Sequence, residues 1–294
     1  FVIPIIARSF DCLHSPHYNA PILRRKRLVV TIHDLIHLHF PNYLPSGAAF
    51  LYAKTVLPVI CRRADAIITV SDYTKSDLVQ TLGINPIKIS VIHHGIDPVF
   101  VTKEERTEGS NPAYFLYVGL IKAHKNLGVL LDAFQKVKQK LKLDSLKLEL
   151  VGAADRKQPI VREWLERIKN DSSISLRSNI SDNELKKLYR NATALVLPSL
   201  YEGFGFPLLE AMASRIPIIA SMAASIPEVA GADTALYFDP HSVSELETRL
   251  EQILTSKELR DRLIQAGQKR IPLFDWEVAA QKTIRVYESI FGKN

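Results

Sequence analysis

The sequence is poor in cysteine and contains no long apolar run. Of its 294 residues only two are cysteines, Cys12 and Cys61, which lie in apolar surroundings without CxxC spacing. A disulfide framework is therefore not expected, and free thiols favour a reducing compartment. No apolar run approaches the roughly 20 residues that a membrane-spanning helix needs. The first residues carry no positively charged leader. These absences favour a cytoplasmic protein.

The charge balance is basic and points to anionic partners. Lys and Arg number 38 against 31 Asp and Glu, which gives a net charge of +7. This excess suits an anionic ligand or an anionic membrane surface, such as the inner face of a membrane, and does not choose between them. Basic and aromatic residues do not alternate along the chain, so nucleic acid is not an expected partner.

Apolar, β-branched runs alternate with helical segments along the chain, which predicts βαβ units and parallel sheets. Strands are expected at 10–14, 28–32, 66–70, 89–92, 114–118, 146–151, 194–197, 216–220 and 235–238. Helices are expected at 46–63, 71–82, 126–142, 159–170, 181–190 and 208–213, from 242, from 256, and at 276–290. A polar, charged stretch containing Gly109-Ser110-Asn111-Pro112 interrupts this alternation and reads as a linker.

Two Rossmann-like α/β domains follow from this pattern. The first, 1–98, holds only four strands, and the segment 277–294 is expected to return to it as a C-terminal helix. The linker is 99–112, and the second domain is 113–276.

The segment between the strand at 194–197 and the helix at 208–213 carries two acids, Glu202 and Glu210. Ligands of open α/β sheets bind at such strand ends, and a helix start attracts anions. Glu202 lies in the loop, whereas Glu210 lies about one turn into the helix among apolar residues, where paired sugar hydroxyls would satisfy it. The alternative is an ordinary β-loop-α unit with a surface glutamate and a glutamate favoured by the helix dipole.

Several further motifs occur in a characteristic order. They are Asn126-Leu127, Ser225-Ile226-Pro227-Glu228-Val229, Phe238-Asp239-Pro240 and Phe274-Asp275-Trp276. With the Glu-x7-Glu spacing of Glu202 and Glu210, they make the chain, from about Phe10 onward, resemble the retaining family 4 glycosyltransferases of the GT-B fold. The resemblance implies transfer of a mannose- or glucose-type sugar from GDP-mannose or a UDP-sugar to a glycan or lipid-linked acceptor, as in polysaccharide biosynthesis.

The resemblance also implies roles for residues of the second domain. Glu202 would be a catalytic residue beside the transferred sugar, Glu210 would accept hydrogen bonds from the ribose hydroxyls, and Lys125 would bind the diphosphate. The remaining donor-binding residues would be Gly119, His124, Ile180, Gly203, Phe204, Gly205 and Phe206.

In the first domain the resemblance assigns the active-site histidine to His33. On the acceptor side it implies His14 and Asp34. Both histidines end predicted strands, although an isolated histidine is more often a structural residue. A metal site from His33, Asp34 and His37 is conceivable by residue type. The family resembled is generally metal-independent, so no cofactor or metal is expected.

The chain departs from the family pattern in two places. Leu120 and His124 stand where some relatives carry arginine, so the phosphate clamp has less permanent charge unless Lys122 compensates. The strand, glycine-rich loop and βα units that normally precede the His14 strand are absent, which implies a truncated first domain. The strand at 10–14 would then leave an open sheet edge. The chain would be a fragment, a second chain would cover this edge, or the domain has been rebuilt.

These departures keep a second function open, a non-catalytic or partner-dependent nucleotide-sugar-binding module derived from such an enzyme. A third alternative is another GT-B enzyme, such as a nucleotide-sugar epimerase. The Gly203-Phe204-Gly205-Phe206-Pro207 segment argues against the epimerase.

Overall fold

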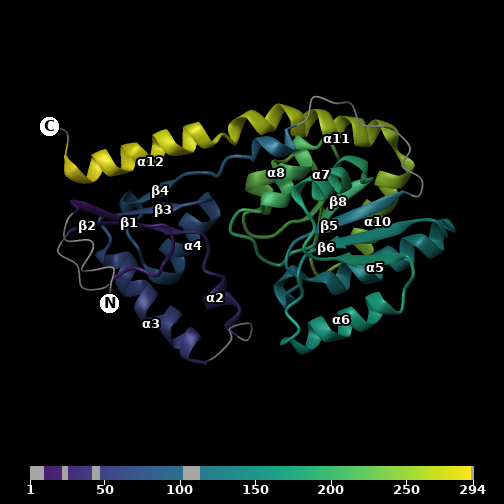
Figure 1. Ribbon diagram of the computed structural model, residues 1–294, viewed down its shortest axis with the longest axis horizontal. Helices are drawn as coiled ribbons and strands as arrows, with labels where there is room; N and C mark the ends of the chain where they lie inside the picture. Colours follow the sequence, from purple (N-terminus) through teal and green to yellow (C-terminus); the bar gives the residue numbers. More distant parts are fainter. Residues whose placement is uncertain (1–9, 22–25, 42–46, 102–112, 293–294) are drawn as a thin grey trace. The chain divides into compact units, whose positions relative to one another are not determined.

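The computed structural model describes residues 10–21, 26–41, 47–101 and 113–292 (Figure 1). The chain divides into two compact units: unit 1 comprises 1–95 and 275–294, and unit 2 comprises 96–274. The linker predicted at 99–112 falls outside the described residues from 102 onward. Among the residues that the structure describes, no helix is both long and apolar enough to cross a bilayer.

Unit 1 contains a four-stranded parallel sheet in the order β1-β2-β3-β4. Its strands are β1 (Cys12–Ser15), β2 (Arg27–Ile32), β3 (Ala66–Thr69) and β4 (Ile89–Val91). The prediction of four strands is confirmed for the described residues, although β1 begins two residues later than expected. In the described part of the chain β1 pairs only with β2, so it lies at the sheet edge.

The helices of unit 1 cover both faces of this sheet. They are α2 (Ile36–His39), α3 (Gly47–Arg63), α4 (Asp72–Leu82) and α12 (Trp276–Phe291), with a short 3-10 turn η3 (Pro86–Lys88). Successive side chains of a strand point to opposite faces. Accordingly Val30 packs in one cluster with Ile60 of α3, while Val29 packs in another with Val286 of α12. The predicted capping of α4 by Ser71 is confirmed, because the Ser71 side chain accepts from the Thr74 N–H.

Unit 2 contains a six-stranded parallel sheet in the order β10-β9-β8-β5-β6-β7. Its strands are β5 (Tyr114–Val118), β6 (Lys147–Val151), β7 (Ile174–Arg177), β8 (Ala194–Leu197), β9 (Ile218–Ser221) and β10 (Ala235–Phe238). The expected strands are present, and β7 is an additional one. β5 and β8 are neighbours at the centre of the order, so the loops that follow them start side by side.

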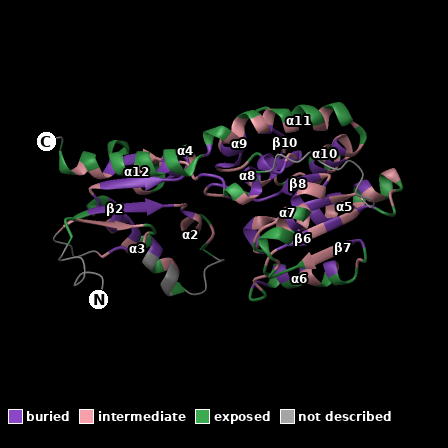
Figure 2. Ribbon diagram, turned by 45° about the horizontal axis from the view of Figure 1, so that its top comes forward, coloured by how far each residue is buried: buried purple, intermediate pink, exposed green. Residues whose placement is uncertain are grey.

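Helices α5 to α9 of unit 2 connect successive strands, and α10 and α11 follow the last strand. They are α5 (Leu127–Leu141), α6 (Pro159–Lys169), α7 (Asp182–Asn191), α8 (Phe206–Ala213), α9 (Ile226–Ala230), α10 (Val243–Thr255) and α11 (Lys257–Arg270), with 3-10 turns η4 (Pro98–Phe100), η5 (Ala123–Lys125) and η6 (Ile271–Leu273). Apolar residues of α5, α6 and α10 form the core with the sheet. Figure 2 shows buried strands beneath helices such as α11 whose outer surfaces are exposed. The predicted capping box of Ser181 and Glu184 opens α7.

A close backbone approach joins the ends of β5 and β6. A Cβ atom on Gly152 would lie 2.0 Å from the carbonyl oxygen of Gly119, and Gly152 has a φ of +148°. Only glycine fits there. The Gly119 N–H in turn donates to the Val151 carbonyl at 2.9 Å. The loop after β5, which carries Gly119, is thereby held against the end of β6.

Candidate functional site

Glu202 is anchored by two side chains at the carboxyl end of the unit 2 sheet. The Lys125 Nζ atom lies 2.6 Å from Glu202 Oε1. The Ser199 hydroxyl donates to the same oxygen at 2.7 Å. The side chains of Lys125 and Glu202 are only 17% and 11% exposed. The structure thus brings together a cation from the loop after β5 and a carboxylate from the loop after β8, although 77 residues separate them in sequence.

Serine hydroxyls fix the backbone of the loop that bears Glu202. Ser225 donates to the Glu202 carbonyl at 2.8 Å, and Ser221 donates to the Ser199 carbonyl at 2.5 Å. The Leu200 N–H donates to the carbonyl of the buried His124 at 2.8 Å. Ser225 belongs to a motif quoted for the family resemblance, and the contact gives it a physical reason. The loop is therefore rigidly tied to its neighbours, as positioning a functional carboxylate requires.

The glycine-bearing part of this loop leads directly into α8. Gly205 has a φ of +96°, in the left-handed region where glycine is favoured. Phe204 is buried and packs edge-on against Phe274, with ring centroids 6.0 Å apart. Phe206, the first residue of α8, is 41% exposed, while Gly203 is half-buried. The backbone N–H groups and positive dipole end of α8 therefore follow immediately after Glu202 in the loop.

Glu210 lies half-buried on α8 and accepts a hydrogen bond from a tyrosine that the sequence had not singled out. The Tyr189 hydroxyl of α7 donates to Glu210 Oε2 at 2.6 Å. Burial raises the pKa of Glu210, and this hydrogen bond opposes the rise. Burial, followed by the nearby charge of Glu210, raises the pKa of Tyr189 well above its ordinary value, so the phenol stays protonated as a donor. The sequence offered only a weak sign that Tyr189 has a role at the site, since it appears simply as a tyrosine in an amphipathic helix.

The segment after β5 contacts the loop that bears Glu202. The Tyr117 hydroxyl donates to the carbonyl of Leu120, whose side chain is 52% exposed. The Asn126 side-chain amide donates to the Pro198 carbonyl at 3.1 Å and to the Pro240 carbonyl at 2.7 Å. Asn126, in the segment after β5, therefore binds the segments that follow β8 and β10. These contacts give a physical reason for the Asn126-Leu127 motif. Ile180 is half-buried and precedes the N-cap of α7.

In unit 1, both ring nitrogens of His14 are engaged. Nδ1 lies 2.6 Å from the Tyr287 hydroxyl of α12, and Nε2 lies 2.9 Å from the Thr31 hydroxyl. Burial lowers the pKa of His14, which favours the neutral ring. These contacts tie β1 and β2 to α12.

His33, at the end of β2, is held by a hydrogen bond and a stacked ring. Its Nε2 lies 3.0 Å from the Pro16 carbonyl, so this nitrogen donates, and the lone pair of a neutral ring lies on Nδ1. The His94 ring stacks on it with centroids 5.5 Å apart. Burial and the neighbouring His33 and His93 lower the pKa of His94 to about 4. His94 is therefore neutral near pH 7 and adds no charge beside His33.

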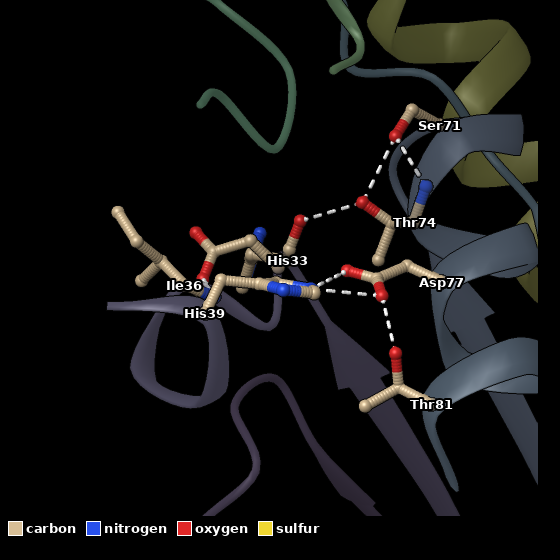
Figure 3. Close-up of polar contacts among 8 residues, drawn as sticks. His33, Ile36, His39, Ser71, Thr74, Asp77 and Thr81 are labelled. Atoms are coloured by element: carbon tan, nitrogen blue, oxygen red, sulfur yellow. Dashed lines mark hydrogen bonds and ion pairs between the residues drawn. The ribbon is translucent and has the colours of Figure 1, made fainter. Parts of the chain in front are cut away.

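Helix α4 holds the backbone around His33, as Figure 3 shows. The Thr74 hydroxyl donates to the His33 carbonyl at 3.2 Å. One turn further, the Asp77 carboxylate contacts His39 Nε2 at 2.8 and 2.9 Å. Asp34 Oδ1 accepts from the N–H of Ile36, the first residue of α2, at 3.0 Å.

The histidine and carboxylate side chains around His33 do not form the metal site conceived from residue type. Within the described residues, the ligand atoms of His33, Asp34 and His37 do not all lie within 4.8 Å of one another.

Two family models together match nearly the whole chain. Residues 101–270 match the model described as glycosyl transferases group 1, and residues 3–100 match glycosyltransferase family 4. The chain therefore belongs to the group 1 glycosyl transferases, and the predicted family is confirmed. Its α/β architecture of two parallel sheets is the GT-B fold.

Relatives of this family, and solved structures of the same fold, align with most of the chain. It is 28% identical over 283 residues to O-antigen chain mannosyltransferase B of Escherichia coli, covering 94% of this chain and 73% of that protein. It is 31% identical to O-antigen chain mannosyltransferase RfbU of Salmonella typhimurium, covering 81% of this chain but 64% of that protein. The structure of Anabaena Alr3699/HepE in complex with UDP-glucose aligns over 98% of this chain and 81% of its own, with a TM-score of 0.83 and 17% identity.

Proposed function

We propose that this protein is a retaining glycosyltransferase that moves a mannose- or glucose-type sugar from a nucleoside diphosphate sugar to a hydroxyl of a glycan or lipid-linked acceptor. The contact of Lys125 with Glu202 carries the proposal, because it places a half-buried cation against a carboxylate in the loop that leads into α8. The mannosyltransferase names of relatives and the UDP-glucose bound to HepE support this class of donor.

Charge development explains why the site needs these groups. A departing nucleoside diphosphate gains negative charge, which a preorganised cation and helix N-terminus stabilise. Lys125 is the cation, and backbone groups of Gly119, Gly203 and Gly205 allow the phosphates to approach closely. Glu202 holds hydroxyls of the transferred sugar. Because Lys125 supplies the positive charge, the proposed reaction requires no metal.

The nucleoside half of the donor lies, in this proposal, along α7 and α8. Glu210 accepts hydrogen bonds from the ribose hydroxyls, and the Ile180 segment lies beside the base. Phe204 and Phe206 line the loop near the sugar, while the buried His124 supports it through its carbonyl bond to Leu200.

The acceptor-side residues belong to unit 1. His33 is the proposed catalytic histidine, since its Nδ1 carries the lone pair of the neutral ring. His14 and Asp34 shape this region through their contacts with Tyr287 and Ile36.

A single substitution tests the proposal. Glu202→Ala should abolish sugar transfer from GDP-mannose and UDP-glucose while nucleotide binding, measured by calorimetry with GDP and UDP, persists. Glu251→Gln is the matched control, because Glu251 pairs with Lys140 in the same unit without being part of the Glu202 loop. Turnover of Glu202→Ala comparable to that of the control would contradict the assignment.

A non-catalytic nucleotide-sugar-binding module is the second candidate. The observation in its favour is that Leu120 is exposed and His124 is buried where some relatives carry arginine. Binding of GDP or UDP without release of sugar from the donor would support the module. Measurable transfer to any hydroxyl acceptor, or hydrolysis of the donor, would exclude it.

Two further partners are proposed from charge and topology. The net charge of +7 favours a cytoplasmic protein that also binds an anionic membrane face, which co-sedimentation with phosphatidylglycerol vesicles tests. The edge position of β1 favours a second chain along it, which a concentration-dependent sedimentation mass tests.

A further inference from the structure

The Tyr189–Glu210 contact is the shortest described link between α7 and the carboxylate of α8. The phenolic oxygen lies 2.6 Å from Glu210 Oε2, and the tyrosine side chain is fully buried. A buried phenol that donates to a carboxylate forms a charge-assisted hydrogen bond. Such a bond fixes the rotamer of both side chains, and it occupies one of the two carboxylate oxygens.

The surroundings of Glu210 disfavour its charged form, and the Tyr189 hydroxyl opposes this effect. Burial raises the pKa of Glu210, and the negative charges of Asp97 and Asp182 raise it further. Tyr189 is the group that acts in the opposite direction, through its hydrogen bond to the charged form. Among the described residues, Tyr189 is the group whose hydrogen bond lowers the pKa of Glu210, so its loss leaves burial and the charges of Asp97 and Asp182 unopposed there.

We propose that Tyr189 is a positioning residue of the nucleotide pocket, which fixes Glu210 Oε2 so that Oε1 is presented to the ribose hydroxyls of the donor. This inference rests on the proposed function and adds to it a residue that does not touch the nucleotide itself. It predicts that the protein prefers a ribonucleotide to a deoxyribonucleotide, because Glu210 binds the ribose hydroxyls and Tyr189 orients Glu210.

Contacts around Tyr189 and along α7 restrict the movement of its side chain. Its ring meets the Phe100 ring edge-on at 5.8 Å. The capping box of Ser181 and Glu184 fixes the start of α7, and the Tyr114 hydroxyl donates to the Leu188 carbonyl at 2.7 Å near its end. The phenol can therefore move little without moving the helix.

Tyr189→Phe tests the inference, because it removes only the hydroxyl. Tyr114→Phe is the matched control, because it removes another hydroxyl that binds α7. That hydroxyl donates to the carbonyl of Leu188, the residue next to Tyr189. Calorimetry with UDP and GDP, and with their 2′-deoxy forms, gives the dissociation constants. We expect Tyr189→Phe to weaken binding of the preferred ribonucleotide about tenfold and to reduce its advantage over the deoxynucleotide. Tyr114→Phe should change neither quantity by more than about twofold.

The pH dependence of binding provides a readout that a merely structural role would not move. The charged carboxylate of Glu210 accepts hydrogen bonds more strongly than the neutral carboxyl group does, so nucleotide binding weakens as pH falls through its raised pKa. Since the Tyr189 hydrogen bond lowers that pKa, Tyr189→Phe should shift this acid limb to higher pH. Tyr114→Phe should leave the limb in place.

Glu210→Gln tests the same hydrogen bond at its acceptor. It is the variant to measure if Tyr189→Phe does not fold cooperatively. It should remove the acid limb and the ribose preference, and adding Tyr189→Phe to it should shift nothing further. A wild-type protein that binds UDP or GDP while Tyr189→Phe behaves as Tyr114→Phe would overturn the inference alone. A wild-type protein that binds neither nucleotide would overturn the proposed function together with it.

Discussion

The Lys125–Glu202 ion pair can be measured by a double-mutant cycle in the absence of any substrate. The variants are Lys125→Met, Glu202→Gln and the combination of the two. Each removes one charge while keeping a side chain of similar length. In the wild-type protein, a donor diphosphate would meet Lys125 already paired with Glu202. The strength of this ion pair therefore also bears on the proposed function.

The structure gives the expected magnitudes. Removing one partner of a fully buried pair costs about 3–5 kcal/mol because the other charge stays desolvated. With 17% and 11% exposure, water reaches this pair, so we expect about 2–3 kcal/mol for Lys125→Met. Glu202→Gln should cost about 1–2 kcal/mol, since the amide oxygen still accepts from Ser199. The double variant should cost less than the sum, with a coupling of about 2 kcal/mol.

Urea unfolding followed by a tryptophan of unit 2 measures these costs. The sequence has two tryptophans, of which Trp164 lies in the unit 2 core and Trp276 lies in α12 of unit 1. In a Trp276→Phe background, Trp164 fluorescence reports the unit that contains the pair. The solvent-exposed Lys140–Glu251 pair is the control and should show a clearly smaller coupling than the Lys125–Glu202 pair. Additive effects of Lys125→Met and Glu202→Gln would refute the reasoning.

Three further outcomes are expected. Gly152→Ala should destabilise unit 2 by about 3 kcal/mol in urea unfolding, because its Cβ would meet the Gly119 carbonyl oxygen at 2.0 Å at a φ of +148°; an unchanged midpoint would contradict the close approach. Asp77→Ala should lower the unfolding free energy of unit 1 by about 2 kcal/mol, because the carboxylate contacts His39; circular dichroism follows this loss. Sugar transfer from GDP-mannose or UDP-glucose should keep its rate in excess EDTA if Lys125 is the cation of the proposed reaction; a loss restored by Mg²⁺ would show a metal requirement.

Local features of this fold follow directly from the sequence. Ser71 and the Ser181–Glu184 box begin helices, and Gly83 ends one, because each satisfies backbone groups within a few residues. The alternation of β-branched runs and helices predicted the strands of both sheets except β7. That strand reads Ile174-Ser175-Leu176-Arg177, which is short, only partly apolar and directly preceded by polar residues. Its pairing with β6, rather than its composition, makes it a strand.

The sequence by itself determined the family, the Glu202–Glu210 spacing, the position of His33 directly after a strand and that of Glu202 in the loop after β8. The prediction that His14 ends its strand was wrong, because β1 continues to Ser15. Only the tertiary structure decided which side chains meet. Lys125 reaches Glu202 across 77 residues, and His14 reaches Tyr287 across 273. Periodicity tells which face of a helix or strand a residue occupies, but a hydrogen bond between distant elements depends on how those elements pack. Tyr189 shows the difference, because its place on α7 was readable from the chain and its partner Glu210 was not.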